Sequence, residues 1–330
     1  MRAIVIEGVG GPEVLALRQV ADPAPGPNEL LVGVHASALN RADLLQCRGL
    51  YPAPPGAPKD IPGLEYAGEV LETGAAVTQW SKGDRVMGIV GGGAAAERLC
   101  VHEDEALPTP AGLTSTQAAA IPEAFMTAYD AAVLQGGLSA NQWVSVNAVG
   151  SGVGTALVQI ARHLGAHSVG SSRTEAKLEV ARRLGLTEAV LGASPELAAA
   201  TLQATEQRGA HVVVDLVGGA GLSPLVGALQ RCGTLILVGL LGGLAAEIPL
   251  ARVLTKRLRI QGTVLRSRSH EEKRELALSF RRELLSAFDG PSPALAPLID
   301  RVIPWQNVAT GHEALEQNAT TGKIVLEHVD

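Results

Sequence analysis

The sequence predicts an α/β protein with two domains, a small β-rich barrel and a doubly wound parallel sheet. Its 330 residues are enough for two compact domains, and 46% hydrophobic against 18% charged residues provide a large core. The first third shows short apolar segments separated by Pro and Gly. From about residue 120, short apolar segments alternate with helical ones. Such alternation indicates parallel strands, because these require crossover helices.

The strands of the first third are predicted at residues 30–38, 69–71 and 85–90. Pro and Gly are dense at 23–27 and 52–58 and mark turns, as in a small barrel. Three glycines and three alanines at 91–96 predict a flexible loop with little side-chain bulk. This loop either opens a substrate mouth to flat rings or is a surface loop without a role.

The second region predicts a series of strands and helices followed by a return to the first domain. Strands are expected at 143–148, 167–171, 189–191, 212–217 and 234–238, and helices at 154–164, 175–184, 197–207 and 222–229. A charged helix at 270–288, a Pro-rich loop and a strand at 323–326 follow. We therefore expect one domain at 1–120 and 265–330 and the other at 121–264.

Composition argues against several classes of protein. A net charge of −6 is unlike the basic face of a nucleic-acid-binding protein. The sequence has no run of about 18 apolar residues and no signal-peptide pattern, so we expect a cytoplasmic enzyme without a membrane span. Cys47, Cys100 and Cys232 form no CxxC pair, and the eight histidines form no HxxxH pair. We interpret them as packing or surface residues and predict no metal site.

A glycine-rich turn is the most specific local motif. Gly150-Ser151-Gly152-Val153-Gly154 joins a predicted strand to a predicted helix. Glycines allow the backbone N–H groups of such a turn to approach a pyrophosphate at the positive end of the helix. The spacing differs from GxGxxG, and a purely structural turn is the alternative. Its place at the first strand of a βα series favours dinucleotide binding in a Rossmann domain.

The end of the next strand distinguishes NADPH from NADH. It reads Gly-Ser-Ser-Arg-Thr at 170–174, without the acidic residue that binds the ribose hydroxyls of NAD. Ser172, Arg173 and Lys177 offer donors to a 2′-phosphate. The alternative is that both cations are solvated, but cations at a helix start oppose its dipole. We predict NADPH.

Two segments resemble the N-terminal GroES-like domain of medium-chain dehydrogenases/reductases. They are residues 62–70, Pro-Gly-Leu-Glu-Tyr-Ala-Gly-Glu-Val, and 80–86, Trp-Ser-Lys-Gly-Asp-Arg-Val. The zinc alcohol dehydrogenases of this superfamily have Gly-His-Glu where this chain has Leu64 in place of His. Their first and last cysteine ligands correspond to Asn40 and Glu123, and their four-cysteine lobe is missing. The resemblance therefore implies an enzyme without zinc.

Other segments are similar to zinc-free quinone oxidoreductases of the zeta-crystallin-like family. These are residues 40–44, 48–51, 117–124 and 151–156, and Leu-Arg-Ser-Arg at 265–268 resembles the tumour-suppressor-induced branch. The similarity spans nearly the whole chain in register. It implies a GroES-like catalytic domain, a Rossmann domain that binds NADPH, a quinone substrate and a homodimer.

The resemblance also implies roles for individual residues. Asn40 and Thr127 would lie near the nicotinamide, with Thr127 at its carboxamide, and Tyr51 would face the substrate. The other implied NADPH contacts are Ser151, Gly152 and Val153 at the pyrophosphate, Ser172, Arg173 and Lys177 at the 2′-phosphate, Gly239, Leu240, Leu241, Leu265 and Ser267 near the nicotinamide or its ribose, and Lys323 at the edge of the cofactor cleft. Two departures stand out: Leu191-Gly192 replaces a Tyr that covers the 2′-phosphate in relatives, and Arg173 replaces a Gly.

The expected reaction is hydride transfer from the nicotinamide to a quinone, with a hydrogen bond to the developing oxyanion. Tyr51 is the candidate donor and a water the alternative, although Tyr51 is also interpretable as a packed loop anchor. Asp43 and Glu65 are expected to be structural, binding Arg41 or backbone amides.

Three functions stay open at this point. They are NADPH:quinone reduction, reduction of a conjugated enal or enone, and NADPH binding with little catalysis. The segment 259–264 is expected to be an apolar edge strand that pairs across a two-fold axis, the alternative being a solvent-covered monomer edge.

Overall fold

The computed structural model describes residues 1–328, and the chain divides into two compact units. Residues 1–126 and the chain from Leu265 onward form the first, which we call the mixed-sheet unit, and Thr127–Val264 forms the second, the parallel-sheet unit. The sequence predicted the second domain to begin at residue 121. The observed division comes later because the π-helical turn Pro122–Met126 packs on strands of the mixed-sheet unit.

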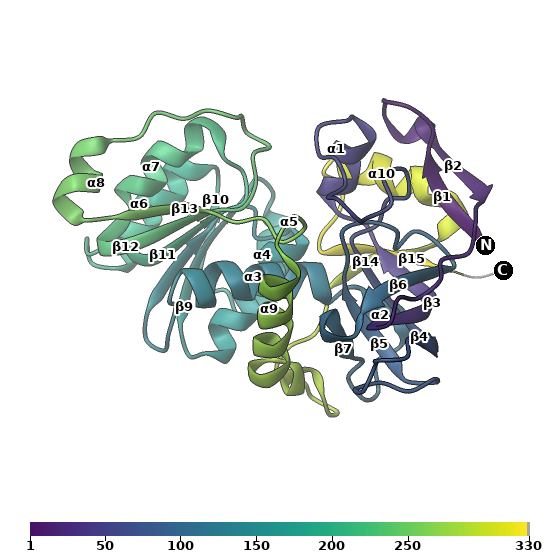
Figure 1. Ribbon diagram of the computed structural model, residues 1–330. Helices are drawn as coiled ribbons and strands as arrows, with labels where there is room; N and C mark the ends of the chain where they lie inside the picture. Colours follow the sequence, from purple (N-terminus) through teal and green to yellow (C-terminus); the bar gives the residue numbers. More distant parts are fainter. Residues whose placement is uncertain (329–330) are drawn as a thin grey trace. The chain divides into compact units, whose positions relative to one another are not determined.

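A seven-stranded sheet builds the mixed-sheet unit (Figure 1). Its order is β14-β15-β3-β4-β5-β7, with β6 paired to β3. The strands are β3 (Glu29–Ala38), β4 (Glu65–Thr73), β5 (Arg85–Ile89), β6 (Arg98–His102), β7 (Ala106–Pro108), β14 (Ile299–Pro304) and β15 (Lys323–Glu327). Pairing of β15 with β3, with Val325 opposite Ala38, confirms that the chain returns to the first domain.

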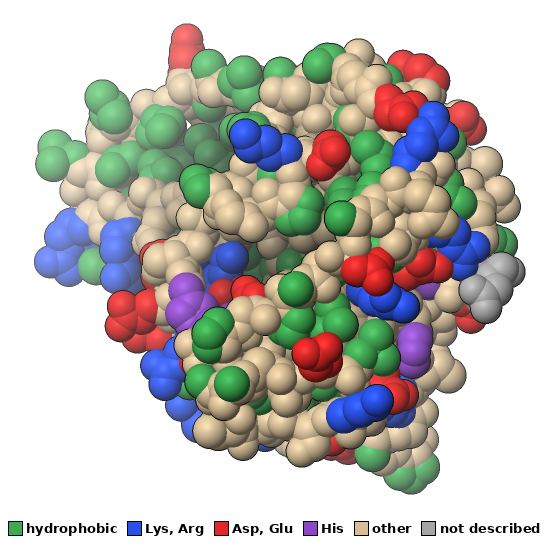
Figure 2. Space-filling model, turned by 45° about the vertical axis from the view of Figure 1, so that its right-hand side comes forward, with side chains coloured by type: hydrophobic (Ala, Val, Ile, Leu, Met, Phe, Trp, Pro, Cys, Tyr) green, Lys and Arg blue, Asp and Glu red, His purple; other side chains and the backbone are tan. Residues whose placement is uncertain are grey.

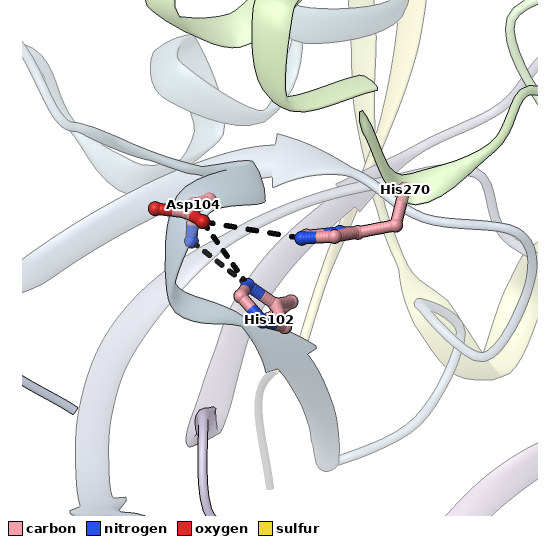
Figure 3. A group of neighbouring side chains, drawn as sticks. All are labelled: His102, Asp104 and His270. Atoms are coloured by element: carbon pink, nitrogen blue, oxygen red, sulfur yellow. Dashed lines mark hydrogen bonds and ion pairs between the residues drawn. The ribbon is translucent and has the colours of Figure 1, made fainter. Parts of the chain in front are cut away.

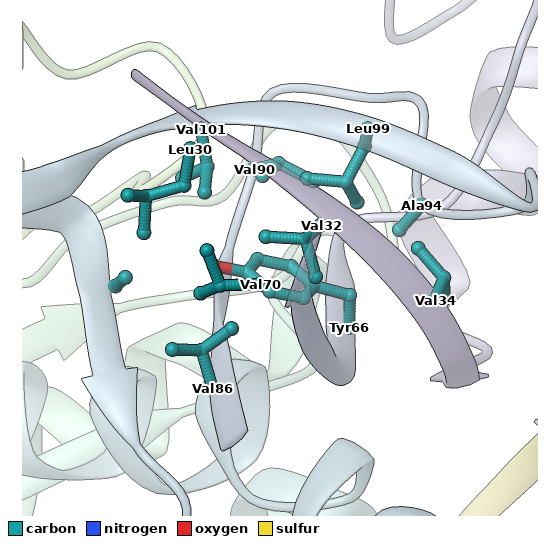
Figure 4. Close-up of a cluster of buried hydrophobic side chains, with 11 residues drawn as sticks. Leu30, Val32, Val34, Tyr66, Val70, Val86, Val90, Ala94, Leu99 and Val101 are labelled. Atoms are coloured by element: carbon teal, nitrogen blue, oxygen red, sulfur yellow. The ribbon is translucent and has the colours of Figure 1, made fainter. Parts of the chain in front are cut away.

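The core of this sheet comes from the alternation of side chains along its strands, because every second residue faces the same side. Figure 4 shows the cluster, in which Leu30, Val32 and Val34 of β3 face Tyr66 and Val70 of β4. Around the sheet lie a hairpin of β1 (Arg2–Ile6) and β2 (Leu15–Gln19), and the helices α1 (Arg41–Cys47), α2 (Ser115–Ala119), α9 (His270–Glu283) and α10 (Val308–Glu316).

The parallel-sheet unit contains six parallel strands in the order β10-β9-β8-β11-β12-β13. They are β8 (Trp143–Val146), β9 (His167–Ser172), β10 (Glu188–Leu191), β11 (Ala210–Asp215), β12 (Leu229–Leu237) and β13 (Arg259–Gly262). The helices are α3 (Thr127–Tyr129), α4 (Gly152–His163), α5 (Glu175–Leu184), α6 (Ser194–Ala204), α7 (Leu222–Gly227) and α8 (Leu250–Lys256). The predicted doubly wound sheet is confirmed.

Several elements differ from the sequence-based prediction, and those near the C-terminus and at residues 91–96 differ most. β14 and α10 were not predicted, and the charged helix ends at Glu283 before a 3₁₀ turn, Leu285–Phe288. The expected flexible loop at 91–96 is wrong, because Ala94, Ala95 and Ala96 are buried. The carbonyl of Ala95 accepts a hydrogen bond from Ile4, and the amides of Ala94 and Ala95 bond to Gly63 and Pro62. Small side chains here permit close backbone packing rather than motion.

No helix among the described residues is long and apolar enough to cross a membrane.

Candidate cofactor and substrate sites

The glycine turn of the parallel-sheet unit connects β8 to α4 as predicted. Ser151 is the N-cap of α4, and its hydroxyl accepts a hydrogen bond from the Gly154 amide at 3.1 Å. A Cβ at Gly154 would lie 2.6 Å from the Ala148 carbonyl oxygen, so only glycine allows the chain to cross itself here. The turn therefore places Ser151, Gly152 and Val153 at the N-terminus of a long helix, where an anion is stabilised.

Lys177, which follows β9 in the chain, brings its side chain against this turn. A Cβ at Gly150 would come within 2.7 Å of the Lys177 side chain, so that side chain packs directly on the turn. Ser172 is buried at the end of β9, and Arg173 is exposed next to it. The first acidic residue that follows, Glu175, pairs with Arg182. The structure thus brings Ser172, Arg173 and Lys177 to one edge, with no carboxylate at the strand end itself.

The loop after β12 carries Gly239, Leu240 and Leu241. A Cβ at Gly239 would lie 2.4 Å from the Leu216 carbonyl oxygen, so this loop passes close to the turn after β11. Leu240 and Leu241 are exposed. Sequence analysis missed the group that fixes the neighbouring turn: buried Asp215 accepts hydrogen bonds from the amides of Val217 and Gly218 and from Asn147.

Thr127 is a buried residue whose hydroxyl has no hydrogen-bond partner in the part of the chain that the structure describes. A buried polar group without a partner costs about 1–3 kcal/mol, so the Thr127 hydroxyl would gain from a hydrogen bond to a bound ligand. The carboxamide that the resemblance places at Thr127 is a group able to bond to this hydroxyl.

A second group of polar residues lies in the mixed-sheet unit around Lys323. The Lys323 ammonium contacts a Glu65 carboxylate oxygen at 2.6 Å, the Asn40 side-chain oxygen at 2.6 Å and the Leu39 carbonyl at 2.8 Å. Glu65 also accepts from the Asn40 amide group at 3.0 Å and from the Glu123 backbone at 2.8 Å. All three ammonium donors are used inside the unit. Lys323 therefore binds Glu65 rather than presenting a free cation to a cofactor.

Asp43 and Glu123 complete this polar cluster. Asp43 accepts from the backbone amides of Asn40 at 2.7 Å and Gly63 at 3.2 Å, which confirms its expected role, and burial raises its pKa to about 6. Burial and the nearby Glu65 carboxylate raise the pKa of Glu123 to about 8. Glu65 likewise accepts from a backbone amide, that of Glu123, as expected, and it also pairs with Lys323, which was not expected; Arg41 bonds to Asn318.

Tyr51 packs against Arg266, a residue that sequence analysis did not select. The Arg266 guanidinium lies 5.0 Å from the centre of the Tyr51 ring. It also donates to the carbonyls of Gly91 and Tyr51, at 2.7 and 2.8 Å, and to the Gln46 side chain at 2.6 Å. Burial raises the pKa of the Tyr51 phenol, and the Glu123 carboxyl adds to this rise. The signal for Arg266 was present in the motif at 265–268, where it lies between buried Leu265 and exposed Ser267.

Comparison with known proteins gives two family models that together match most of the chain. Residues 26–111 match the "Alcohol dehydrogenase GroES-like domain", and residues 152–281 match the "Zinc-binding dehydrogenase" family. Relatives include a quinone oxidoreductase-like protein 2 homolog of Nematostella vectensis, 31% identical over 98% of this chain and 88% of the relative. The quinone oxidoreductase of Sus scrofa is 30% identical over 99% of this chain and 97% of the relative.

The chain belongs to the quinone oxidoreductase family of the medium-chain dehydrogenases/reductases. Among solved structures, Escherichia coli quinone oxidoreductase complexed with NADPH superposes with a TM-score of 0.86 at 26% identity, over 99% of this chain and 100% of that one. An NAD-dependent alcohol dehydrogenase gives a TM-score of 0.87 at 29% identity, over the full length of both chains. Both confirm the predicted GroES-like and Rossmann architecture.

One of the two matching families is described as zinc-binding, so the residues of this chain must be tested for their fit to a zinc ion. The residues that correspond to the zinc ligands of the alcohol dehydrogenases are Asn40, Leu64 and Glu123, which supply neither sulfur nor imidazole. Asn40 is bonded to Lys323, whose ammonium also neutralises Glu65. The positive charge of Lys323 beside the Glu65 and Glu123 carboxylates opposes the binding of a zinc ion there. These residues therefore do not fit a catalytic zinc ion.

Proposed function

We propose that this member of the family is an NADPH-dependent quinone reductase that transfers hydride without zinc. Support for the cofactor comes from the end of β9, where Ser172 and Arg173 stand in place of an acidic residue and Lys177 packs on the glycine turn. Support for the substrate comes from relatives that carry the name quinone oxidoreductase over the full length of this chain. The observation that carries the proposal is the cationic strand end, because a 2′-phosphate requires donors there.

In this proposal the parallel-sheet unit binds NADPH. The helix start at Gly152 and the amides of the turn would bind the pyrophosphate, and Arg173 with Lys177 the 2′-phosphate. The buried Thr127 hydroxyl would bind the carboxamide and so orient the nicotinamide ring. NADPH, when bound, would supply a hydride, that is a proton with two electrons, to an electrophilic atom of the acceptor.

The mixed-sheet unit would polarise the quinone. Reduction of a neutral quinone to the hydroquinone takes one hydride and one proton: the hydride supplies one hydrogen with both electrons, and the medium supplies the other as a proton. The Tyr51 hydroxyl would donate a hydrogen bond to the oxygen on which negative charge develops, and Arg266 fixes the Tyr51 ring. The raised pKa of Tyr51 keeps the phenol protonated for this role at neutral pH.

The test of the cofactor assignment compares two arginine variants. Stopped-flow oxidation of NADPH and NADH would be followed with 9,10-phenanthrenequinone for the wild type, Arg173→Gln and Arg183→Gln. Arg183 is an exposed arginine on α5 and serves as the matched control. We expect Arg173→Gln to raise the KM for NADPH about tenfold, equivalent to about 1.4 kcal/mol, with little change for NADH.

Three outcomes would contradict parts of this proposal. Equal KM values for NADPH in both arginine variants would remove the role of Arg173. Turnover with a conjugated enone but with no quinone would replace the quinone by an enone as substrate. Tight NADPH binding without turnover on either acceptor would leave a cofactor-binding protein with little catalysis.

We further propose that the oxidoreductase forms a homodimer through β13. This strand is at the edge of the parallel sheet and is exposed, and Ile260 lies on it. Leu250 and Leu254 on α8 are more than 70% exposed. Hydrophobic side chains gather at the upper left of Figure 2, on the side where Figure 1 places α8. Sedimentation equilibrium should give twice the 34.0 kDa chain mass, and a monomer at micromolar concentration would refute the dimer.

A further inference from the structure

Two histidines and an aspartate converge at a place in the mixed-sheet unit that the proposed reaction does not use. His102 is the last residue of β6, Asp104 lies in the 3₁₀ turn Glu103–Glu105, and His270 is the first residue of α9 (Figure 3). Their ligand atoms lie within 4.8 Å of one another. The Asp104 Oδ2 atom is 3.8 Å from His102 Nδ1 and 3.9 Å from His270 Nε2.

The hydrogen bonds around these side chains determine which ring nitrogens carry lone pairs. His270 Nδ1 lies 2.8 Å from a Glu105 carboxylate oxygen, which only accepts, so Nδ1 donates and the neutral ring has its lone pair on Nε2. His102 Nδ1 accepts a 3.3 Å hydrogen bond from the Asp104 amide, so its lone pair is on Nδ1. In the neutral rings, the His270 Nε2 lone pair lies 3.9 Å from Asp104 Oδ2, whereas the His102 Nδ1 lone pair accepts the Asp104 amide hydrogen and would exchange this long hydrogen bond for a metal ion.

We propose that His102, Asp104 and His270 form a binding site for a divalent transition-metal ion of the zinc class. Bonds of about 2.0–2.2 Å in a tetrahedral arrangement separate ligand atoms by about 3.4 Å. The observed separations of 3.8 and 3.9 Å exceed this by about half an ångström, within the reach of small side-chain rotations. Two imidazoles and one carboxylate leave a fourth position for water, which is a ligand set that zinc accepts.

A carboxylate already orients one of the two imidazoles at this site. The hydrogen bond from His270 to Glu105 is the carboxylate–histidine arrangement that fixes the tautomer of a metal-binding imidazole. The His102 and His270 rings are packed with centroids 3.9 Å apart, so the two imidazoles already lie side by side at the proposed site.

Two cations compete with the metal ion for the acidic ligands. Arg274 Nε lies 3.2 Å from Asp104 Oδ2, and Lys273 Nζ lies 3.8 Å from Glu105. The Arg274 side chain is 48% exposed, so it is able to rotate into solvent when a metal ion replaces it. This competition gives a directional prediction, because removal of the arginine should strengthen metal binding whereas removal of a ligand should weaken it.

Sequence analysis predicted no metal site because it searched for ligands at short spacing. The aspartate follows His102 by two residues, but the second histidine is contributed by α9, far along the chain. Only the packing of α9 on the turn Glu103–Glu105 brings the three ligands together.

The test is titration of the full-length protein with ZnCl₂ at pH 7.5 by isothermal calorimetry, using the wild type and five variants. His102→Gln and His270→Gln remove a ligand, and Glu105→Gln removes the carboxylate that orients His270. Arg274→Gln removes the cation that pairs with Asp104, and the control is His163→Gln at an exposed histidine of α4. We expect one zinc ion per chain at this site, at least tenfold weaker binding in either ligand variant, and about tenfold weaker binding in Glu105→Gln. Arg274→Gln should bind more tightly, and His163→Gln should match the wild type.

Thermal unfolding separates loss of the site from loss of the fold. Each ligand variant should unfold near the wild-type Tm without metal, and zinc should raise the Tm of the wild type but not that of His270→Gln. Zinc binding that is equal in the wild type and His270→Gln, or no binding at 100-fold molar excess of zinc, would overturn the proposal. So would weaker binding in Arg274→Gln.

Discussion

The cluster around Lys323 and the hydroxyl of Thr127, one in each unit, differ in whether they already have partners. In the mixed-sheet unit, Lys323, Glu65 and Asn40 bond to one another, and the lysine has no donor left. In the parallel-sheet unit, the buried Thr127 hydroxyl has no partner among residues 1–328. A saturated cluster stabilises the fold, whereas an incomplete one indicates a ligand. The Thr127 hydroxyl therefore supports a bound cofactor more directly than the saturated cluster around Lys323 supports a particular acceptor.

The largest expected effect comes from breaking the saturated cluster. Lys323→Met would leave the fully buried Glu65 carboxylate without its cation, so we expect it to lower the free energy of unfolding by about 3–5 kcal/mol. Urea denaturation at pH 7 measures this loss. The exposed Lys82→Met is the control and should change stability by less than about 0.5 kcal/mol.

A double variant separates the ion pair from simple loss of packing. Lys323→Met leaves the Glu65 carboxylate charge unpaired, and Glu65→Gln removes that charge. The double variant should therefore be more stable than Lys323→Met alone. If Lys323→Met unfolds like the wild type, or if the double variant is the less stable of the two, Lys323 and Glu65 are not a coupled buried pair.

A smaller effect is expected from Glu123, a buried acid of the same cluster that lies near Glu65. Burial raises its folded-state pKa to about 8 from an ordinary value of 4.5, so the folded protein retains a proton that the unfolded chain releases. This contribution to stability is complete below pH 4.5 and is lost as the pH rises through 8. The wild type should therefore lose about 2 kcal/mol relative to Glu123→Gln between pH 6.5 and pH 9.

The pH window also limits the contribution of Asp43, the other buried acid of this cluster whose pKa is raised. Asp43, with a pKa of about 6, is mostly ionised by pH 6.5, so it contributes little to the difference. Unfolding by urea at several pH values gives the measurement, and the exposed Glu188→Gln should follow the wild type throughout. Parallel curves for the wild type and Glu123→Gln would show that Glu123 titrates normally in the folded protein.

The two units also differ in how much of each could be predicted from the sequence. The parallel sheet was predictable because its signals are local: each strand is a short apolar segment, and the glycine turn at 150–154 lies within one motif. The polar cluster was not, since Asn40, Glu65 and Lys323 come from three distant segments that meet only when β15 pairs with β3. Arg266 was overlooked for the same reason, because its partners Gln46, Tyr51 and Gly91 lie far from it in the chain.

The smallest expected effect tests whether Thr127 is an incomplete site. Thr127→Val removes a buried hydroxyl that has no partner in the described residues, so the cofactor-free protein should keep or gain up to about 1 kcal/mol of stability. The matched control is Thr201→Val, because the equally buried Thr201 hydroxyl donates to the Leu197 carbonyl at 2.7 Å and contacts Ser145. That change should cost about 1 kcal/mol. NADPH should bind several-fold more weakly to Thr127→Val and equally well to Thr201→Val, as measured by fluorescence titration. Similar losses of stability in both variants would mean that Thr127, like the cluster around Lys323, already has its partner within the fold.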